Sequence, residues 1–135
     1  MKSPIKCAII GYGYMGEIRR KVLEQNDDVE LSLICEPDGE KLADAQNFTV
    51  VTDPVQIIQS DVDAVFVCTP NQLNAELTIK CLERGKHVFC EKPPGKTLND
   101  IVQIQASEKK NPGTKLMFGF NHRYHPGVLR AKSIV

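Results

Sequence analysis

A glycine-rich hexapeptide near the N-terminus constrains the fold more than any other feature of the sequence. It is GYGYMG at residues 11–16, and it follows an apolar segment at residues 5–10. Gly11 permits a tight turn, Gly13 lets the backbone approach a ligand, and Gly16 lets a helix pack closely on a sheet. The motif therefore predicts a strand, a phosphate-binding turn and a helix whose N-terminus faces the phosphates.

Short apolar segments alternate with helical ones along the rest of the chain. Apolar segments of four to six residues predict strands that are buried on both faces, and these are residues 5–10, 31–35, 48–51, 64–68, 87–90 and 116–120. Apolar residues three and four positions apart predict helices at residues 15–25, 71–84 and 97–110. Strand–helix alternation of this kind predicts an α/β fold, a doubly wound parallel sheet of about six strands with helices on both faces.

The helical segments also predict which side chains face the core. Ile18 and Val22, with Met15 one turn earlier, form the apolar stripe of the first helix. The second helix carries its stripe at four-residue spacing, on Leu73, Leu77 and Cys81. The third begins at Thr97 and has Asp100 three residues later, the pattern of a capping box.

Composition excludes several classes of protein. The 135 residues fit one domain, and the 17 basic residues balance the 17 acidic ones, which argues against nucleic-acid binding. The longest apolar run, residues 64–68, is far too short to span a membrane, and no segment resembles a signal peptide. The five cysteines include no CxxC pair and favour free core thiols in a reducing cytoplasm, with a reactive or metal-bound cysteine as the alternative.

Glu36 ends the second predicted strand and lies 20 residues after Gly16. In dinucleotide-binding folds, an acid at this place accepts hydrogen bonds from the adenosine ribose hydroxyls. A carboxylate would repel the extra phosphate of NADP, and the next residues, Pro37 and Asp38, bring no cation. The sequence therefore predicts NAD, with NADP less favoured, and a solvated turn acid is the alternative interpretation.

Polar segments follow three more predicted strands, at the ends where ligands bind in such sheets. They lie at residues 69–71, 91–95 and 121–124. Lys92 stands out because it follows a buried strand and precedes Pro93, which favours an extended backbone. A lysine at the mouth of a nicotinamide pocket could hold a substrate oxygen. A solvated surface lysine is the alternative.

Five segments of the sequence, taken in order, carry a resemblance to a known family. In chain order they are GYGYMG (11–16), CEPD (35–38), CTPN (68–71), EKPPGKTLND (91–100) and GFNHRYHP (119–126). Together they resemble the N-terminal half of the Gfo/Idh/MocA family, the glucose–fructose oxidoreductase and inositol dehydrogenase-like proteins. The resemblance covers essentially the whole chain, and the EKP element is its most specific part.

The resemblance implies roles for individual residues. It places Lys92 near the nicotinamide and the substrate as the catalytic residue, with Glu91 supporting the site. The cofactor-binding residues that it implies are Gly11, Gly13, Tyr14, Met15, Gly16, Glu36, Thr69, Pro70, Asn71, Glu91 and Lys92. It assigns Asn121 and Arg123 to the substrate side and implies no metal site.

The resemblance also divides the chain. Residues 1–120 are expected to form a Rossmann-like dinucleotide-binding domain, and residues 121–135 to begin a crossover toward a C-terminal substrate domain outside this chain. Asn74 stands where many members carry a histidine. The missing domain usually supplies a further acid/base residue, for which His122 and His125 are no simple replacement, because a histidine pair in a loop is more often surface or packing.

The activity implied by the resemblance is hydride transfer between a nicotinamide cofactor and a hydroxyl or keto carbon of a sugar, nucleotide sugar or cyclitol. The chain alone is expected to bind the cofactor without efficient turnover. Its expected partners are a small sugar-like molecule and, in a homo-oligomer, further copies, with neither nucleic acid nor membrane. Two alternatives stay open: a non-enzymatic dinucleotide-binding sensor or subunit, and a structural fragment that self-associates.

Overall fold

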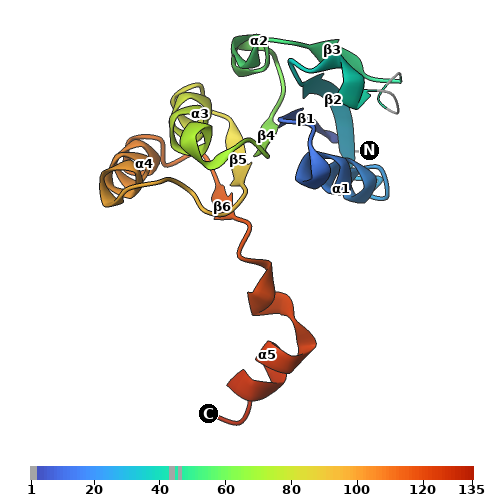
Figure 1. The fold of residues 1–135 in the computed structure, drawn as a ribbon. Coiled ribbons are helices and arrows are strands. Elements are labelled where there is room, and N and C mark those ends of the chain that lie inside the picture. Colours follow the sequence, from blue (N-terminus) through green and yellow to red (C-terminus); the bar gives the residue numbers. More distant parts are fainter. Residues whose placement is uncertain (1–2, 43–44, 46) are drawn as a thin grey trace.

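The computed structural model describes residues 3–42, 45 and 47–135, and its strands form one sheet (Figure 1). The six strands are all parallel and lie in the order β3-β2-β1-β4-β5-β6. Their bounds are β1 Ile5–Ile10, β2 Val29–Cys35, β3 Thr49–Val51, β4 Ala64–Val67, β5 His87–Cys90 and β6 Leu116–Phe118. The predicted doubly wound parallel sheet is confirmed, and each predicted strand is present.

Helices cover the sheet from both sides. The helices are α1 Tyr14–Leu23, α2 Pro54–Gln59, α3 Asn71–Glu83, α4 Leu98–Lys110 and α5 Pro126–Lys132, with 3-10 turns at η1 Gly39–Leu42 and η2 Asn121–Tyr124. Figure 1 shows α1 on one side of the sheet and α2 and α3 on the other, with α4 beside α3. The short helices α2 and α5 were not predicted, although each begins with proline at its first position, a helix-start signal.

Alternate residues of the central strands point into two separate cores. The larger core lies against α2 and α3 and joins strand residues Ala8, Ile10, Val65, Val67, Val88 and Cys90 to helix residues Ile57, Ile58, Leu77, Cys81 and Leu82. The smaller core lies against α1 and consists of Cys7, Ile9 and Leu23, with Phe66 and other partly buried residues around it. This two-sided burial explains why the strands read as continuous apolar runs.

The face of α1 that packs on the sheet differs from the predicted stripe. Val22, predicted to face the core, is 55% exposed, whereas Gly16 and Leu23 are buried. A Cβ atom at Gly16 would lie 2.2 Å from the carbonyl oxygen of Gly11, so only glycine permits this approach. Close packing of the helix backbone at Gly16 therefore decides which face turns inward, and the prediction for Val22 is wrong.

The predictions for α3 and α4 agree more closely with the structure. Leu77 and Cys81 of α3 are buried as predicted, whereas Leu73 is 42% exposed. The predicted capping box of α4 is confirmed, because Thr97 Oγ1 accepts from the Asp100 amide at 3.2 Å and Asp100 Oδ2 accepts from the Thr97 amide at 2.9 Å. Two backbone amide groups at the start of α4 thus have side-chain hydrogen-bond acceptors.

All five cysteines are free, and four of them are buried. Burial raises the pKa of Cys35 to about 11 and that of Cys81 to about 12, because a thiolate is poorly solvated in the core. The predicted burial of the thiols is confirmed for Cys7, Cys35, Cys81 and Cys90, whereas Cys68 is partly exposed.

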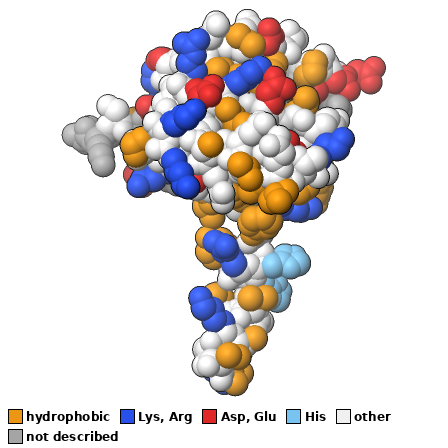
Figure 2. Space-filling model, turned by 90° about the vertical axis from the view of Figure 1, so that its left-hand side faces the viewer, with side chains coloured by type: hydrophobic (Ala, Val, Ile, Leu, Met, Phe, Trp, Pro, Cys, Tyr) orange, Lys and Arg blue, Asp and Glu red, His pale blue; other side chains and the backbone are white. Residues whose placement is uncertain are grey.

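Residues 121–135 form an arm that projects away from the sheet (Figure 2). Every residue of this arm is exposed, and no acidic residue follows Glu108 in the sequence. Apolar and basic side chains follow one another along it (Figure 2). Among the described residues, no helix combines the length and the apolar character that crossing a bilayer requires.

Candidate functional site

A cavity of about 740 Å³ opens at the carboxyl ends of β1, β2 and β4. The strand order reverses there, because β1 pairs with β2 on one side and with β4 on the other. Ligands bind at such reversal points in open α/β sheets, and the volume suits a small molecule. Seven of the residues predicted to bind a cofactor line this cavity: Gly11, Gly13, Tyr14, Met15, Glu36, Thr69 and Pro70.

The glycine loop forms one wall of the cavity from backbone. Gly11 has a φ of +92°, and a Cβ atom on it would lie 2.6 Å from the carbonyl oxygen of Cys68. Gly13 has open space where its Cβ would be, and it begins α1 without a side-chain cap. The first amide groups of α1 therefore have no side chain over them, which fits a pyrophosphate at this helix N-terminus.

Glu36 is buried at the wall of the same cavity. Its Oε2 accepts a hydrogen bond from the Tyr12 amide at 2.8 Å, and its Oε1 accepts one from the Asp38 amide at 3.1 Å. Two backbone groups thus fix the carboxylate, and the carboxylate in turn ties the glycine loop to the end of β2. This tethering function was not predicted, since the sequence indicated only a ligand for ribose hydroxyls.

Sequence analysis missed several residues of the cavity wall. These residues are Ile10, Cys35, Pro37, Asp38, Thr52, Pro54, Cys68, Leu73 and Leu77. Thr52 follows β3 directly, so the rule that polar residues gather at strand ends would have found it. Pro54, Leu73 and Leu77 add apolar surface, against which a flat ring can lie.

The loop after β5 is held by the buried side chain of Asn74 on α3. Asn74 Nδ2 donates to the carbonyl oxygen of Pro93 at 2.9 Å and to that of Glu91 at 3.3 Å. Its Oδ1 accepts from the Thr69 hydroxyl at 2.9 Å. The Lys92–Pro93 peptide bond between these contacts is cis. Asn74 therefore joins the ends of β4 and β5 where the family resemblance pointed to a histidine.

Glu91 and Lys92 differ sharply in environment. Glu91 is buried and its carboxylate pairs with Arg19 of α1, whereas Lys92 is exposed. Neither residue lines the cavity, and the same holds for the predicted site residues Gly16, Asn71, Asn121 and Arg123. The structure thus brings together most of the predicted residues that follow β1, β2 and β4, whereas the predicted reacting-end residues lie outside the cavity wall.

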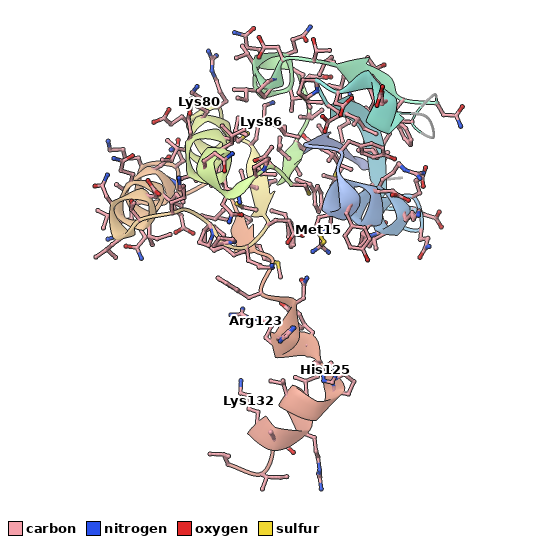
Figure 3. All side chains as sticks on the ribbon, in the orientation of Figure 1. Met15, Lys80, Lys86, Arg123, His125 and Lys132 are labelled. Carbon is pink, nitrogen blue, oxygen red and sulfur yellow. The ribbon has the colours of Figure 1, made fainter. Side chains whose placement is uncertain are left out.

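Arg123, His122 and His125 lie on the arm. Figure 3 shows Met15 at the lower end of α1 above the root of the arm, with Arg123 and His125 farther along it. His125 Nδ1 accepts from the Gly127 amide at 3.2 Å and thereby caps α5. His125 therefore has a local structural role in this chain.

Comparison with protein families matches residues 5–120 to one family model, the Gfo/Idh/MocA model described as an oxidoreductase family with an NAD-binding Rossmann fold. Myo-inositol 2-dehydrogenase of Thermotoga maritima is 32% identical over 97% of this chain and 40% of its own length. The 2,7-anhydro-N-acetylneuraminate hydratase of Mediterraneibacter gnavus is 31% identical over 95% of the chain and 34% of its own length.

A solved structure agrees with the sequence comparison. Scyllo-inositol dehydrogenase of Lactobacillus casei, with bound NAD(H) and scyllo-inositol, superposes with a TM-score of 0.91 at 27% identity. The match covers 98% of this chain and 41% of that protein. The chain thus spans about two fifths of the length of the proteins that it matches.

Proposed function

Because the chain belongs to the Gfo/Idh/MocA oxidoreductase family and has its NAD-binding Rossmann fold, we propose that it is the cofactor domain of a sugar or cyclitol dehydrogenase. The observation that carries the proposal is the cavity at the strand reversal, with the uncapped N-terminus of α1 on one side and Glu36 on the other. This arrangement suits a dinucleotide, with pyrophosphate at the helix and ribose at the acid.

The binding roles follow from the positions of the residues. The backbone at Gly11, Gly13 and the first turn of α1 would hold the pyrophosphate, together with Tyr14 and Met15 at the cavity wall. Glu36 would accept hydrogen bonds from the adenosine ribose, and its charge disfavours the extra phosphate of NADP. Thr69, Pro70 and Asn71 at the start of α3 would border the nicotinamide ribose. NAD is therefore the cofactor that the site favours.

Bound NAD supplies a carbon that takes up or returns hydride. Lys92 follows β5 beside the cavity, and its ammonium would hold and polarise the substrate oxygen by donating a hydrogen bond. Asn121 and Arg123 would contact the substrate from the root of the arm. The myo-inositol and scyllo-inositol dehydrogenases among the similar proteins support a polyol or sugar as the substrate class.

Residues 1–120 form the proposed cofactor domain, and residues 121–135 the proposed link to a substrate domain. The exposure of the whole arm and the greater length of the similar proteins support this division. The intact mass of the polypeptide in its source cells tests it. A mass well above 15.1 kDa is expected, and a mass of 15.1 kDa would overturn the two-domain proposal.

The proposed setting is the cytoplasm, and the proposed assembly is a homo-oligomer without nucleic acid or membrane. Five free thiols suit a reducing compartment, and the net charge of zero gives no attraction to nucleic acid. Exposed apolar residues on the arm, including Val128, Leu129 and Ile134, support self-association.

NADH binding by the 135-residue chain tests the cofactor proposal. In a fluorescence titration, we expect Glu36→Ala to weaken NADH binding about tenfold or more, since a hydrogen bond to a charged group contributes about 1.5–3 kcal/mol. Glu40→Ala, four residues later on exposed η1, is the matched control and should bind like the wild type. The absence of NADH binding at millimolar concentration in the wild type would overturn the proposal.

A further inference from the structure

A buried ion pair lies directly beside the exposed lysine of the proposed reacting end. Glu91 is 5% exposed, and its Oε1 accepts from Arg19 Nε at 2.8 Å and also from Arg19 Nη2. The guanidinium carbon of Arg19 lies 4.6 Å from the centre of the Phe89 ring. Two hydrogen bonds and a cation–π contact therefore fix the orientation of the guanidinium.

The second oxygen of Glu91 is enclosed as well. A Cβ atom at Gly119 would lie 2.7 Å from Glu91 Oε2, so the carboxylate sits against bare backbone at the end of β6. The Glu91 amide donates to the carbonyl oxygen of Val67 at 2.9 Å, which continues the β4–β5 ladder. Side chain and backbone of Glu91 are thus both held in place.

The backbone of Lys92 is anchored on both sides, whereas its side chain contacts no charged or polar partner among the described residues. Glu91 precedes it, and Pro93 follows it with a carbonyl oxygen bonded to Asn74. Within the described part of the chain, the Lys92 ammonium makes no ion pair or hydrogen bond. Lys92 is thus an exposed cation next in sequence to a buried carboxylate that Arg19 already neutralises.

We propose that Arg19 is a positioning residue, which holds the Glu91 charge so that the Lys92 ammonium stays available for an oxygen of the ligand. Without Arg19, the Glu91 carboxylate would be left buried and unpaired, and the cation next to it in the chain is Lys92. The Lys92 side chain would then fold back toward Glu91. The identity of the ligand rests on the proposed function, but the pairing of Arg19 with Glu91 does not.

A purely structural role is the competing explanation, since Arg19 also joins α1 to the sheet. The two explanations differ in whether the charge of Glu91 matters. Under the proposal, Arg19→Met makes the Lys92 amine less accessible only while Glu91 is a carboxylate. Adding Glu91→Gln should therefore restore the accessibility of the Lys92 amine. Under a packing role, the double variant resembles Arg19→Met, because glutamine has the same shape as glutamate.

Trace acetylation with acetic anhydride, read by mass spectrometry, measures this directly. The rate at Lys92 is divided by the rate at Lys109, an exposed lysine of α4 in the same chain. We expect Arg19→Met to lower this ratio about fivefold, the upper end for a partly exposed ion pair. Arg19→Met with Glu91→Gln should return it to the wild-type value, and so should Arg19→Lys, which keeps a cation opposite the carboxylate.

Lys21→Met is the matched control, because it removes an exposed ion pair with Glu17 from the same helix. It should leave the Lys92 ratio unchanged. A ratio in Arg19→Met equal to that of the wild type overturns the proposal, as does a double variant that stays as low as Arg19→Met. Thermal unfolding of each variant confirms that the compared chains are folded.

Glu91→Gln alone keeps the proposal testable if Arg19→Met fails to fold. In the wild type the carboxylate is already held by Arg19, so its neutralisation should leave the Lys92 ratio unchanged, and a change beyond about twofold overturns the proposal. NADH titration of the wild type separates this result from the proposed function. Acetylation needs no cofactor, so a chain that fails to bind NADH refutes the proposed function while the acetylation still decides the role of Arg19.

Discussion

The two ends of the candidate site differ in whether backbone or side chains determine their geometry. The end beside β1 and β2 consists mainly of backbone, tied by the Glu36 carboxylate, and it requires glycine at positions 11 and 16, where a Cβ atom would collide with backbone. The end beside β5 is made of side chains, in which Asn74 and Arg19 hold the loop at Glu91. A backbone-built end admits little variation at its glycines, whereas a side-chain-built end can change its geometry through single substitutions.

Among these changes, Gly11→Ala should lower stability most, because the added Cβ atom lies inside the backbone-built end. The added Cβ would lie 2.6 Å from a backbone oxygen and would occupy a residue with positive φ. We expect Gly11→Ala to lower the free energy of unfolding by about 3 kcal/mol, combining backbone strain with overpacking. Urea unfolding followed by circular dichroism measures the loss.

Gly13→Ala is the control for that experiment, since nothing lies within 4 Å of its added Cβ. Its free energy of unfolding should stay within about 0.5 kcal/mol of the wild type. Its NADH affinity should nevertheless fall, because the methyl group projects where the pyrophosphate approaches. Equal destabilisation by both alanines would refute the difference drawn here between fold-bearing and ligand-facing glycines.

Asn74→Leu should disrupt the side-chain-built end by a smaller amount. The apolar side chain would leave the carbonyl oxygen of Pro93 and the hydroxyl of Thr69 without their partner, at a cost of about 2 kcal/mol. Amide hydrogen exchange should rise at Glu91 and Lys92, which precede two prolines that carry no amide hydrogen, and should stay unchanged at residues 11–16. Asn71→Leu, at the exposed first residue of α3, provides the comparison. Faster exchange at both ends would show that the two are not independent.

Acidification should produce the smallest of these effects, at the start of α4, which follows the β5 loop. The amide groups of Thr97 and Lys96 donate to Asp100 and lower the pKa of its carboxyl below the ordinary 3.8. A lowered pKa in the folded state means that the stabilisation is complete above pH 3.8 and is lost as pH falls through the lowered value.

Hydrogen exchange at residues 96–100, measured from pH 5 downward, checks this expectation. Exchange, corrected for its intrinsic dependence on pH, should accelerate in the wild type below about pH 4. In Asp100→Asn it should be faster from the start and independent of Asp100 titration. The same profile in both proteins would show that the α4 cap does not depend on this carboxylate.

The sequence predicted the backbone-built end far better than the side-chain-built end, for a physical reason. A glycine whose Cβ would collide with backbone leaves its mark on the sequence itself, so the loop at residues 11–16 could be recognised before the fold was known. Glu36 was found in the same way, by its spacing from that loop. The strand positions followed from the apolar runs that burial on two faces requires.

No local sequence pattern indicates the contacts of Arg19 and Asn74. Arg19 meets Glu91 from 72 residues away, and Asn74 meets Pro93 from 19 residues away. Nothing local distinguishes an arginine in the first helix from its neighbour Arg20. The wrong prediction that Val22 faces the core has the same origin. The face of α1 that packs on the sheet is determined by the close contact at Gly16, which is a tertiary contact.

The burial of the thiols has a practical use in spectroscopy. The pKa values of Cys7 and Cys90 are raised by burial to about 11, and that of Cys68, at the cavity wall, to about 12. At pH 7, at most about one in ten thousand such groups is ionised, and only thiolates react quickly with maleimides. A cysteine introduced at exposed Ser133 would therefore take a fluorophore almost alone, and energy transfer from bound NADH to a blue-absorbing label there would report the position of the arm relative to the cofactor.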